Sequence, residues 1–210
     1  MTTSSVLKKI LIGTAGAVFI TGFAVQEKAV AVGVNILNAG FESPTAPFHP
    51  ENGLYYSSND ITSWQINPTP GGSAGVFNPS ASGNSPFSQP VPQGSQVAYD
   101  NGGSITQQLS TNLTANTRYN LSAFVGARND TRYPGSIVEL LAGTTVLASN
   151  SSVTPAPGTF APENVTYTSG SSDAALGQPL TISLISNGGG QTEFDNVTLD
   201  AQSSSTPVPL

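Results

Sequence analysis

Short runs of alternating apolar and polar residues, each broken by turn-forming residues, are the feature that most constrains this fold. Between Tyr119 and Val125 every second residue is apolar, as expected for a strand with one buried face, and Leu180–Leu184 alternates in the same way. No stretch of ten or more residues has a convincing helical period. About ten such segments predict an all-β protein, a two-sheet antiparallel β-sandwich, and the length of the chain favours jelly-roll connectivity.

The other segments that we predict to be strands are Val34–Leu37, Ile61–Ile66, Gln96–Tyr99, Ser104–Leu109, Ser136–Leu141, Thr145–Ala148, Asn164–Thr168 and Glu193–Leu199. Asp100–Gly103 has the composition of a hairpin turn with positive φ, and Gly143-Thr144 is a second candidate. Pro44–Ser58 and Pro68–Pro92 are rich in Pro, Gly, Ser and Asn, so we expect long loops there. Such loops are either functional or disordered, and the sequence leaves both open.

The first 31 residues have the three-part pattern of a secretory signal peptide. Lys8 and Lys9 form a basic start, an apolar run covers Ile10–Ala24, and Ala29–Ala31 is a small-x-small cleavage site. This run is short for a hydrocarbon core of about 30 Å, which disfavours a retained anchor. We therefore divide the chain into a signal peptide (1–31), a β-sandwich domain (32–202) and a flexible C-terminal tail (203–210), and we predict secretion to the periplasm, cell envelope or medium.

Composition excludes several classes of function. Without cysteine the chain has no disulfide, thiol nucleophile or zinc–thiolate site, and a single histidine, His49, cannot form a histidine metal cluster. After signal cleavage no lysine would remain, and three arginines would face eleven acidic residues. Binding to nucleic acid or to an anionic membrane needs clustered cations. We therefore exclude both as partners of the mature chain.

Three motifs, taken in order, resemble a known group of sandwich proteins. They are NAGFES at Asn38–Ser43, SWQI around Trp64, and FDNVTL at Phe194–Leu199. Together with the segments between them, from Val34 to Ala201, they resemble the galactose-binding-like jelly rolls used as carbohydrate-binding modules. They are also similar to secreted bacterial sandwich proteins of the PEP-CTERM-associated type. The Pro-rich end, Thr206–Pro209, stops before the apolar span and basic cluster of that sorting signal, which is therefore missing or truncated.

The resemblance implies a secreted, non-catalytic sandwich that binds carbohydrate or matrix polysaccharide. No pair of carboxylates can be placed across a cleft, as a glycosidase requires, and His49 lies in a loop without a serine nucleophile motif. We therefore predict that the protein is not an enzyme. Two alternatives remain, namely a structural envelope or biofilm protein without sugar binding, and a glycoside hydrolase.

Aromatic and arginine side chains in two predicted loops are the candidate ligand-binding residues. Aromatic rings stack on the C–H faces of sugars, and planar guanidinium groups make bidentate contacts. The candidates are Tyr55 and Tyr56 in NGLYYSSND, and Arg128, Arg132 and Tyr133 in GARNDTRYPG. The alternative for the tyrosines is ordinary packing at the rim, and we expect Trp64 to pack in the core.

The last predicted strand contains an anomaly that suggests a structural calcium site. Strict alternation would place Glu193 and Asp195 on the same face as Val197, whereas a β-bulge at Asp195-Asn196 would return Phe194 and Val197 to the core. The resemblance implies that Glu42 lies close to Asp195. Two adjacent carboxylates repel unless they are protonated or bridged by a cation such as calcium. The alternative is that both bind backbone N–H groups without a metal.

Overall fold

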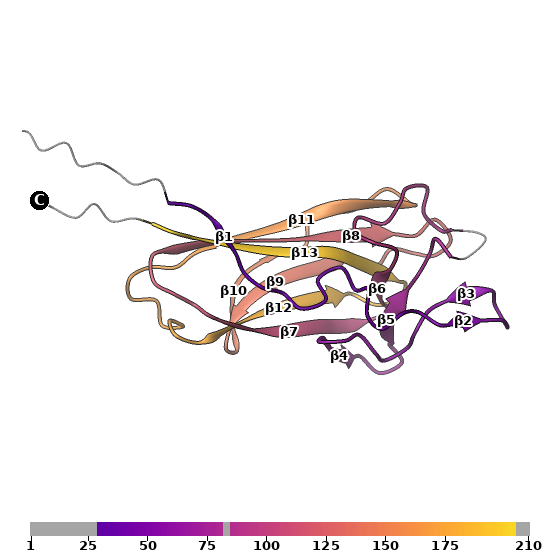
Figure 1. The fold of residues 1–210 in the computed structure, drawn as a ribbon, viewed down its shortest axis with the longest axis horizontal. Helices are drawn as coiled ribbons and strands as arrows, with labels where there is room; N and C mark the ends of the chain where they lie inside the picture. The colour runs from indigo at the N-terminus through magenta and orange to yellow at the C-terminus, as the bar shows by residue number, and fades with distance from the viewer. Residues whose placement is uncertain (1–28, 82–84, 205–210) are drawn as a thin grey trace, which may run out of the picture. The chain divides into compact units, whose positions relative to one another are not determined.

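The computed structural model describes residues 29–81 and 85–204, in which every regular element is a β-strand (Figure 1). The strands in chain order are β1 (Val32–Gly33), β2 (Phe48–His49), β3 (Leu54–Tyr55), β4 (Gln65–Pro68), β5 (Ala74–Phe77), β6 (Val97–Asp100), β7 (Gly103–Asn112), β8 (Thr117–Ala127), β9 (Ser136–Ala142), β10 (Thr145–Asn150), β11 (Thr159–Thr168), β12 (Pro179–Ser186) and β13 (Thr192–Ser203). The predicted signal peptide lies almost entirely outside the described residues. Among those residues no helix is long and apolar enough to cross a membrane.

Two antiparallel sheets form the sandwich. The first sheet has the order β11-β8-β13-β6-β5, with β1 paired to β13, and the second has the order β10-β9-β12-β7-β4. From β6 to β13 each strand lies in the opposite sheet from the one before it, except in the β9–β10 hairpin. This arrangement is the eight-stranded jelly roll, to which β4 and β5 add one edge strand each. The all-β sandwich that the sequence predicts is confirmed.

The main core lies between the two sheets, as the alternation predicts. Tyr119, Leu121 and Val125 of β8 are at most 1% exposed and meet the buried residues of β9 and β12 from the second sheet. Trp64 is buried as predicted, with its ring centroid 5.2 Å from that of Phe41 and its Nε1 donating to the Asn38 carbonyl. This core fixes the position of the two sheets relative to each other. Their edges and outer faces can therefore hold the side chains of a site in place.

Some local predictions are wrong, because tertiary contacts decide what the chain does between the strong strands. The turn at Asp100–Gly103 exists, with φ values of 130° and 132° at Gly102 and Gly103, but it joins β6 to β7 in the other sheet and so makes no hairpin. Gly143-Thr144 does connect the β9–β10 hairpin. The segment Val34–Leu37 is not a strand. The predicted loop Pro68–Pro92 contains the buried edge strand β5.

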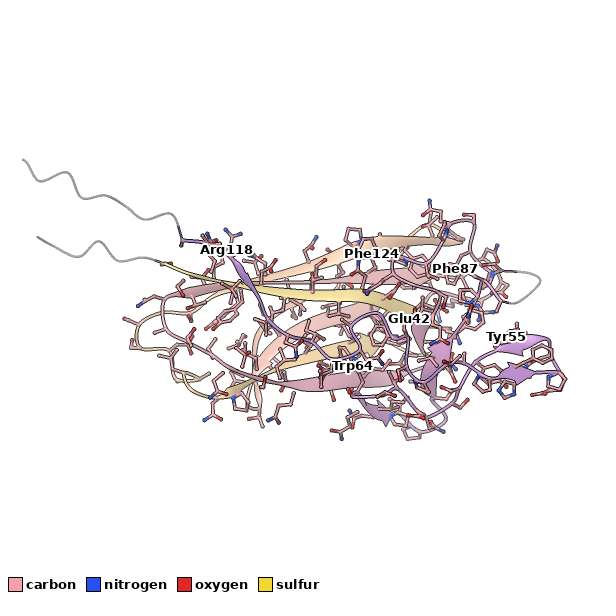
Figure 2. All side chains as sticks on the ribbon, in the orientation of Figure 1. Glu42, Tyr55, Trp64, Phe87, Arg118 and Phe124 are labelled. Atoms are coloured by element: carbon pink, nitrogen blue, oxygen red, sulfur yellow. The ribbon has the colours of Figure 1, made fainter. Side chains whose placement is uncertain are left out.

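A second, smaller apolar cluster lies on the outer face of the first sheet. Ala98 of β6 faces the main core, whereas its neighbours Val97 and Tyr99 face outward and pack with Phe77 of β5. Phe87 and Val91, from the long loop that follows β5, cover this face. The β2–β3 hairpin lies at the same end of the sandwich, and Figure 2 shows Tyr55 and Phe87 there, with Arg118 at the opposite end.

Candidate active site

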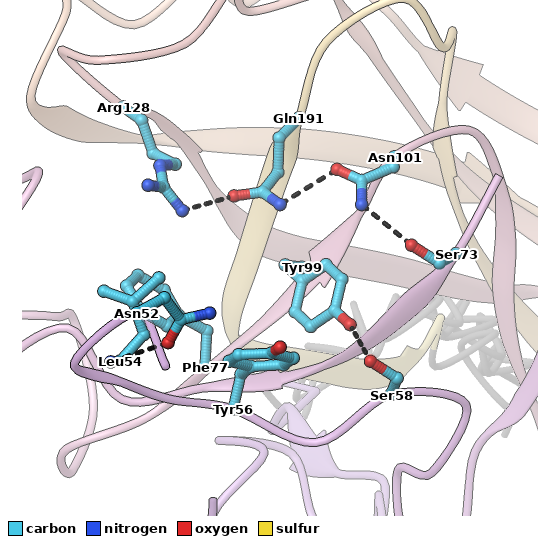
Figure 3. A pocket seen from close by; sticks show the side chains of 10 residues that line it. All are labelled: Asn52, Leu54, Tyr56, Ser58, Ser73, Phe77, Tyr99, Asn101, Arg128 and Gln191. Atoms are coloured by element: carbon cyan, nitrogen blue, oxygen red, sulfur yellow. Dashed lines mark hydrogen bonds between the residues drawn. The ribbon is translucent and has the colours of Figure 1, made fainter. Parts of the chain in front are cut away.

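A cavity of about 260 Å³ lies beside this outer cluster. It is lined by Asn52, Leu54, Tyr56, Ser58, Ser73, Phe77, Tyr99, Asn101, Arg128 and Gln191 (Figure 3). The lining comes from the β2–β3 hairpin, β5, β6, and the segments that follow β8 and precede β13. Four of these ten residues are aromatic or apolar and six are polar, so the cavity offers apolar contact and oriented polar groups to a small molecule.

One wall of the cavity is a continuous row of hydrogen bonds. Arg128 Nη1 donates to Gln191 Oε1 at 2.7 Å, and Gln191 Nε2 donates to Asn101 Oδ1 at 2.9 Å. Asn101 Nδ2 then donates to Ser73 Oγ at 2.8 Å, and Figure 3 shows the four side chains side by side. Arg128 is also held by Asp130 through two bonds of 2.8 Å, which lower the pKa of that carboxyl. These hydrogen bonds hold the four side chains in place, and the positive charge of Arg128 is paired with the carboxylate of Asp130.

Aromatic rings form the facing walls. Tyr56 is stacked on His49, with ring centroids 3.9 Å apart, and the guanidinium of Arg128 lies 5.1 Å above the ring centre of Phe77. The hydroxyl of Tyr99 is hydrogen-bonded to Ser58 Oγ at 3.0 Å. Burial raises the pKa of the Tyr99 phenol, and its hydrogen bond to Ser58 partly offsets that rise. Together with Leu54, the three rings form the apolar part of the cavity lining.

A buried acid lies beside the cavity. Glu193 of β13 pairs with Tyr99 on one side and Gly126 on the other, two residues after Gln191. Its side chain is completely buried, and neither carboxylate oxygen has a hydrogen-bond partner. Burial raises the pKa of Glu193 to about 8, although the nearby Arg128 lowers it. A carboxyl group whose pKa is raised in this way is suited to donate a proton near neutral pH, and Arg128 can stabilise the carboxylate that remains.

Of the five predicted ligand-binding residues, the structure places Tyr56 and Arg128 at the cavity. Tyr55 points to the other side of the hairpin, where its ring centroid is 4.9 Å from that of Phe48. Arg132 is exposed and donates to the Gly189 carbonyl at 3.2 Å. The hydroxyl of Tyr133 turns inward to Ser136 Oγ, at 2.8 Å, and to the Val153 carbonyl. These last three residues are not among those that line the cavity.

The predicted β-bulge is present, and it brings Asp195 into the neighbourhood of Glu42. The register of β13 shifts between Asp195 and Thr198, and Phe194 and Val197 are buried. Asp195 Oδ2 accepts a bond of 2.7 Å from the Gln93 N–H. Burial, with a smaller contribution from the charge of Glu42, raises the pKa of Asp195 to about 7, although its bonds to the Gln93 and Asn196 N–H groups lower it.

Glu42 binds the chain segment that follows Gln93. Its Oε1 accepts from the N–H groups of Ser95 and Gln96, both at 2.8 Å. Among the described residues, no group of three or more Asp, Glu, His or Cys side chains lies close enough to hold a metal ion. A cation at Glu42 and Asp195 would therefore need backbone carbonyls or water as further ligands.

The most important members of the site are not found by sequence reasoning. Glu193, Tyr99 and Gln191 lie in or beside strands that are correctly predicted, but the alternation alone identifies them as strand residues and not as site residues. The one available signal is the anomaly at Glu193, an acid placed among core residues of β13. In the sequence that anomaly supports the bulge and the calcium site at Glu42 and Asp195, and not an acid at a cavity.

The fold and the cavity define the class of protein, which is a jelly-roll sandwich with a cavity suited to a small organic molecule. The comparisons with known proteins identify the family. The sequence profile of the HpiC1-like family, described as HpiC1 cyclase, matches residues 32–200, and the chain belongs to this family. A comparison with curated protein sequences finds no match.

Solved structures of cyclases from Fischerella are similar over most of the chain. The Stig cyclase Fisc from Fischerella sp. TAU, in complex with (3Z)-3-(1-methyl-2-pyrrolidinylidene)-3H-indole, has 29% identity and a TM-score of 0.75, covering 84% of this chain and 100% of the other. A cyclase from the same organism, in complex with 4-(1H-indol-3-yl)butan-2-one, has 29% identity and a TM-score of 0.73, covering 83% and 100%. A CBM4 structure reaches only 17% identity and a TM-score of 0.44, which supports no functional inference.

These comparisons correct the functional part of the sequence interpretation. The prediction of a non-catalytic carbohydrate-binding protein is wrong, and so is the prediction that the protein is not an enzyme, because the chain belongs to a cyclase family. Polysaccharide as the partner is wrong for the same reason, since the similar cyclases were solved with small indole compounds. The resemblance correctly indicated the jelly-roll sandwich, but no comparison supports the PEP-CTERM-associated type. The motifs on which the resemblance rests mark strand and core positions of the jelly roll, and proteins with unrelated functions have these positions in common.

Proposed function

We propose that this protein is a cyclase that closes a ring in a small, unsaturated, aromatic substrate bound in the cavity between Tyr56, Phe77 and Tyr99. The observation that carries the proposal is Glu193, a completely buried acid next to Tyr99 of the cavity wall, whose pKa burial raises to about 8, in a chain of the HpiC1-like family. An indole or a related bicyclic ring is the substrate class that the ligands of the similar cyclases suggest.

The chemistry that suits this arrangement is ring closure started by a proton. Glu193 would give its proton to an unsaturated carbon of the substrate, where the π electron pair forms the new C–H bond and leaves a cation on the adjacent carbon. A second π bond of the same molecule attacks that cation and closes the ring. Loss of a proton to the Glu193 carboxylate completes an isomerisation. Aromatic faces stabilise the intermediate cation, and each favourable cation–π contact is worth about 0.5–2 kcal/mol.

Binding of 4-(1H-indol-3-yl)butan-2-one tests the location of the site. We expect saturable binding by calorimetry, and Tyr56→Ala should weaken it roughly tenfold because one stacking face is lost. Tyr55→Ala is the matched control in the same hairpin and should bind within about twofold of the wild type, because Tyr55 points away from the cavity. Melting curves of both variants establish that the hairpin is retained. Equal losses in the two variants, or no binding by the wild type, would place the site elsewhere.

We further propose that Glu42 and Asp195 hold a structural calcium ion. The two carboxylates lie near enough for the charge of Glu42 to raise the pKa of Asp195. Glu42 Oε2 and both oxygens of Asp195 each accept one hydrogen bond, which leaves a lone pair on each of these three oxygens. Calcium favours such oxygen ligands. Its role would be to fix the segment Gln93–Gln96, which leads into β6, against the bulge of β13.

Thermal melting in calcium and then in excess chelator tests this site. Calcium at a thousand times its dissociation constant stabilises a folded protein by about 4 kcal/mol, or on the order of 10 °C for a domain of this size. We expect a loss of that order on chelation, and no response to chelation in Asp195→Ala. A wild-type melting temperature that is the same in calcium and in chelator would exclude the metal and leave the two carboxylates with the hydrogen bonds already described and that from Ser95 Oγ to Glu42.

A further inference from the structure

A second cavity, of about 310 Å³, adjoins the aromatic-walled cavity described above. The two cavities share three lining residues, Asn101, Arg128 and Gln191, which form their common wall (Figure 3). Among the described residues, the lining of the second cavity contains no aromatic or apolar side chain. Its other lining residues are Asp130, Thr131 and Gly190.

The common wall has hydrogen-bond donors that the protein does not use. A guanidinium has five N–H bonds, and Arg128 donates two of them to Asp130 and one to Gln191. The NH₂ groups of Gln191 and Asn101 have two N–H bonds each and donate one each, to Asn101 Oδ1 and Ser73 Oγ. Within residues 29–81 and 85–204, two N–H bonds of Arg128 and one of each amide therefore have no partner. A group that accepts hydrogen bonds can bind there without displacing any contact of the protein.

The charge around the common wall favours a neutral ligand group over an anion. Asp130 lines the second cavity, its side chain is 52% exposed, and it pairs with Arg128 through two bonds of 2.8 Å. A carboxylate or phosphate group in this cavity would meet the charge of Asp130. A neutral amide can accept from the wall with its oxygen and donate to Asp130 with its N–H.

We propose that the second cavity is a polar subsite for a neutral hydrogen-bond-accepting group, such as an amide or a ketone, carried by the ring system that the aromatic-walled cavity binds. The substrate then lies across the common wall, with its ring against Tyr56 and Phe77 and its polar group beside Thr131. The position of the ring rests on the proposed function, whereas the polar subsite rests on the second cavity and the unused donors of its wall.

Acetamide and acetate have nearly the same shape and differ in charge, so they test the polar subsite without a ring. The full chain is labelled with ¹⁵N, and NMR follows the side-chain NH₂ signals of Asn101 and Gln191 as each compound is added. We expect saturable shifts with acetamide and binding of acetate that is at least about tenfold weaker, because acetate meets the charge of Asp130. Thr131→Trp fills the second cavity and should remove the response to acetamide.

Asn129→Trp is the matched control for this experiment. Asn129 is exposed in the same loop as Thr131 but is not among the residues that line either cavity, so the variant should keep the response to acetamide. Melting curves establish that both variants fold. The absence of a saturable response to acetamide, an equal affinity for acetate, or equal responses in the two variants would overturn the polar subsite.

Indoles with side chains of nearly the same shape connect the polar subsite to the ring. 3-(1H-indol-3-yl)propanamide carries a neutral acceptor, 3-(3-methylbutyl)-1H-indole carries none, and 3-methyl-1H-indole lacks the longer side chain. Gln191→Met removes an unused N–H of the wall and should weaken binding of the amide roughly tenfold more than binding of either other indole, about the value of one hydrogen bond. Thr131→Trp should weaken the two long ligands more than 3-methyl-1H-indole, and calorimetry measures each affinity.

The two sets of ligands separate this proposal from the proposed function. If acetamide binds as expected but no indole does, the location of the ring in the proposed function fails and the polar subsite stands. If the indoles bind but Gln191→Met and Thr131→Trp weaken all of them equally, the second cavity takes no part in substrate binding and the proposal is wrong.

Discussion

Replacing Glu193 by glutamine is expected to lower kcat for ring closure by about 10²- to 10⁴-fold, the usual contribution of a positioned general acid. The amide keeps the size and burial of the side chain but has no proton acidic enough to start the reaction. In the wild type, kcat should fall as the pH rises through about 8, because only the protonated form of Glu193 donates. Steady-state kinetics as a function of pH measure both effects.

Two variants serve as controls for this result. Glu193→Asp keeps an acidic group, but the shorter side chain holds the carboxyl farther from the cavity. We therefore expect an intermediate rate and a retained pH dependence. Asp200→Asn changes an exposed carboxyl on the same strand and should leave kcat unchanged. A fully active Glu193→Gln enzyme would show that another group supplies the proton.

Raising the pH from 5 to 8.5 is expected to lower the melting temperature by roughly 10 °C, because the folded chain holds protons that the unfolded chain releases. Burial raises the pKa of Glu193 from 4.5 to about 8, of Asp195 from 3.8 to about 7 and of Asp100 from 3.8 to about 6. Burial also raises the pKa of Glu163. For each acid the stabilisation is complete below its unfolded-state pKa and is lost as the pH rises through the folded-state value.

Glu193→Gln should remove the largest single part of this slope, because its burial is complete and its carboxylate has no hydrogen-bond partner. We expect the variant to be less stable than the wild type or equal to it near pH 5, and more stable above about pH 8. Melting is measured in chelator, since calcium would compete with protons at Asp195. A wild-type melting temperature that is constant or rises over this range would mean that these acids are ionised in the folded protein.

The candidate site was only partly predictable, and individual residues show why. Tyr56 and Arg128 were found because an aromatic ring and an arginine in a loop are noticeable in the sequence itself. Tyr99 and Gln191 were not, because a tyrosine at a strand position and a glutamine after three glycines are ordinary in isolation. Gln191 is held at the cavity by Arg128, and Tyr99 by Ser58, and these partners are distant in the chain and become neighbours only in the folded sandwich.

The wrong prediction of a non-catalytic carbohydrate-binding protein has a similar origin. Motifs such as FDNVTL report core positions and the bulge of β13, and these are properties of the jelly roll and not of a particular ligand. Glu193, which carries the proposed chemistry, precedes this motif by one residue. In the sequence its one distinguishing feature is its place on the same face as core residues, which does not identify it as a functional acid.

The sequence by itself determined the sandwich, the buried face of each long strand and the bulge at Asp195, because these depend on the alternation of neighbouring residues along the chain. Only the tertiary structure decided that the turn at Asp100–Gly103 crosses between sheets and that β5 extends the first sheet. It also decided the cavity, which is assembled from five separate segments. The raised pKa of Glu193 is also decided by the tertiary structure. It follows from complete burial beside Tyr99 and Gly126, and burial is a property of the packed chain.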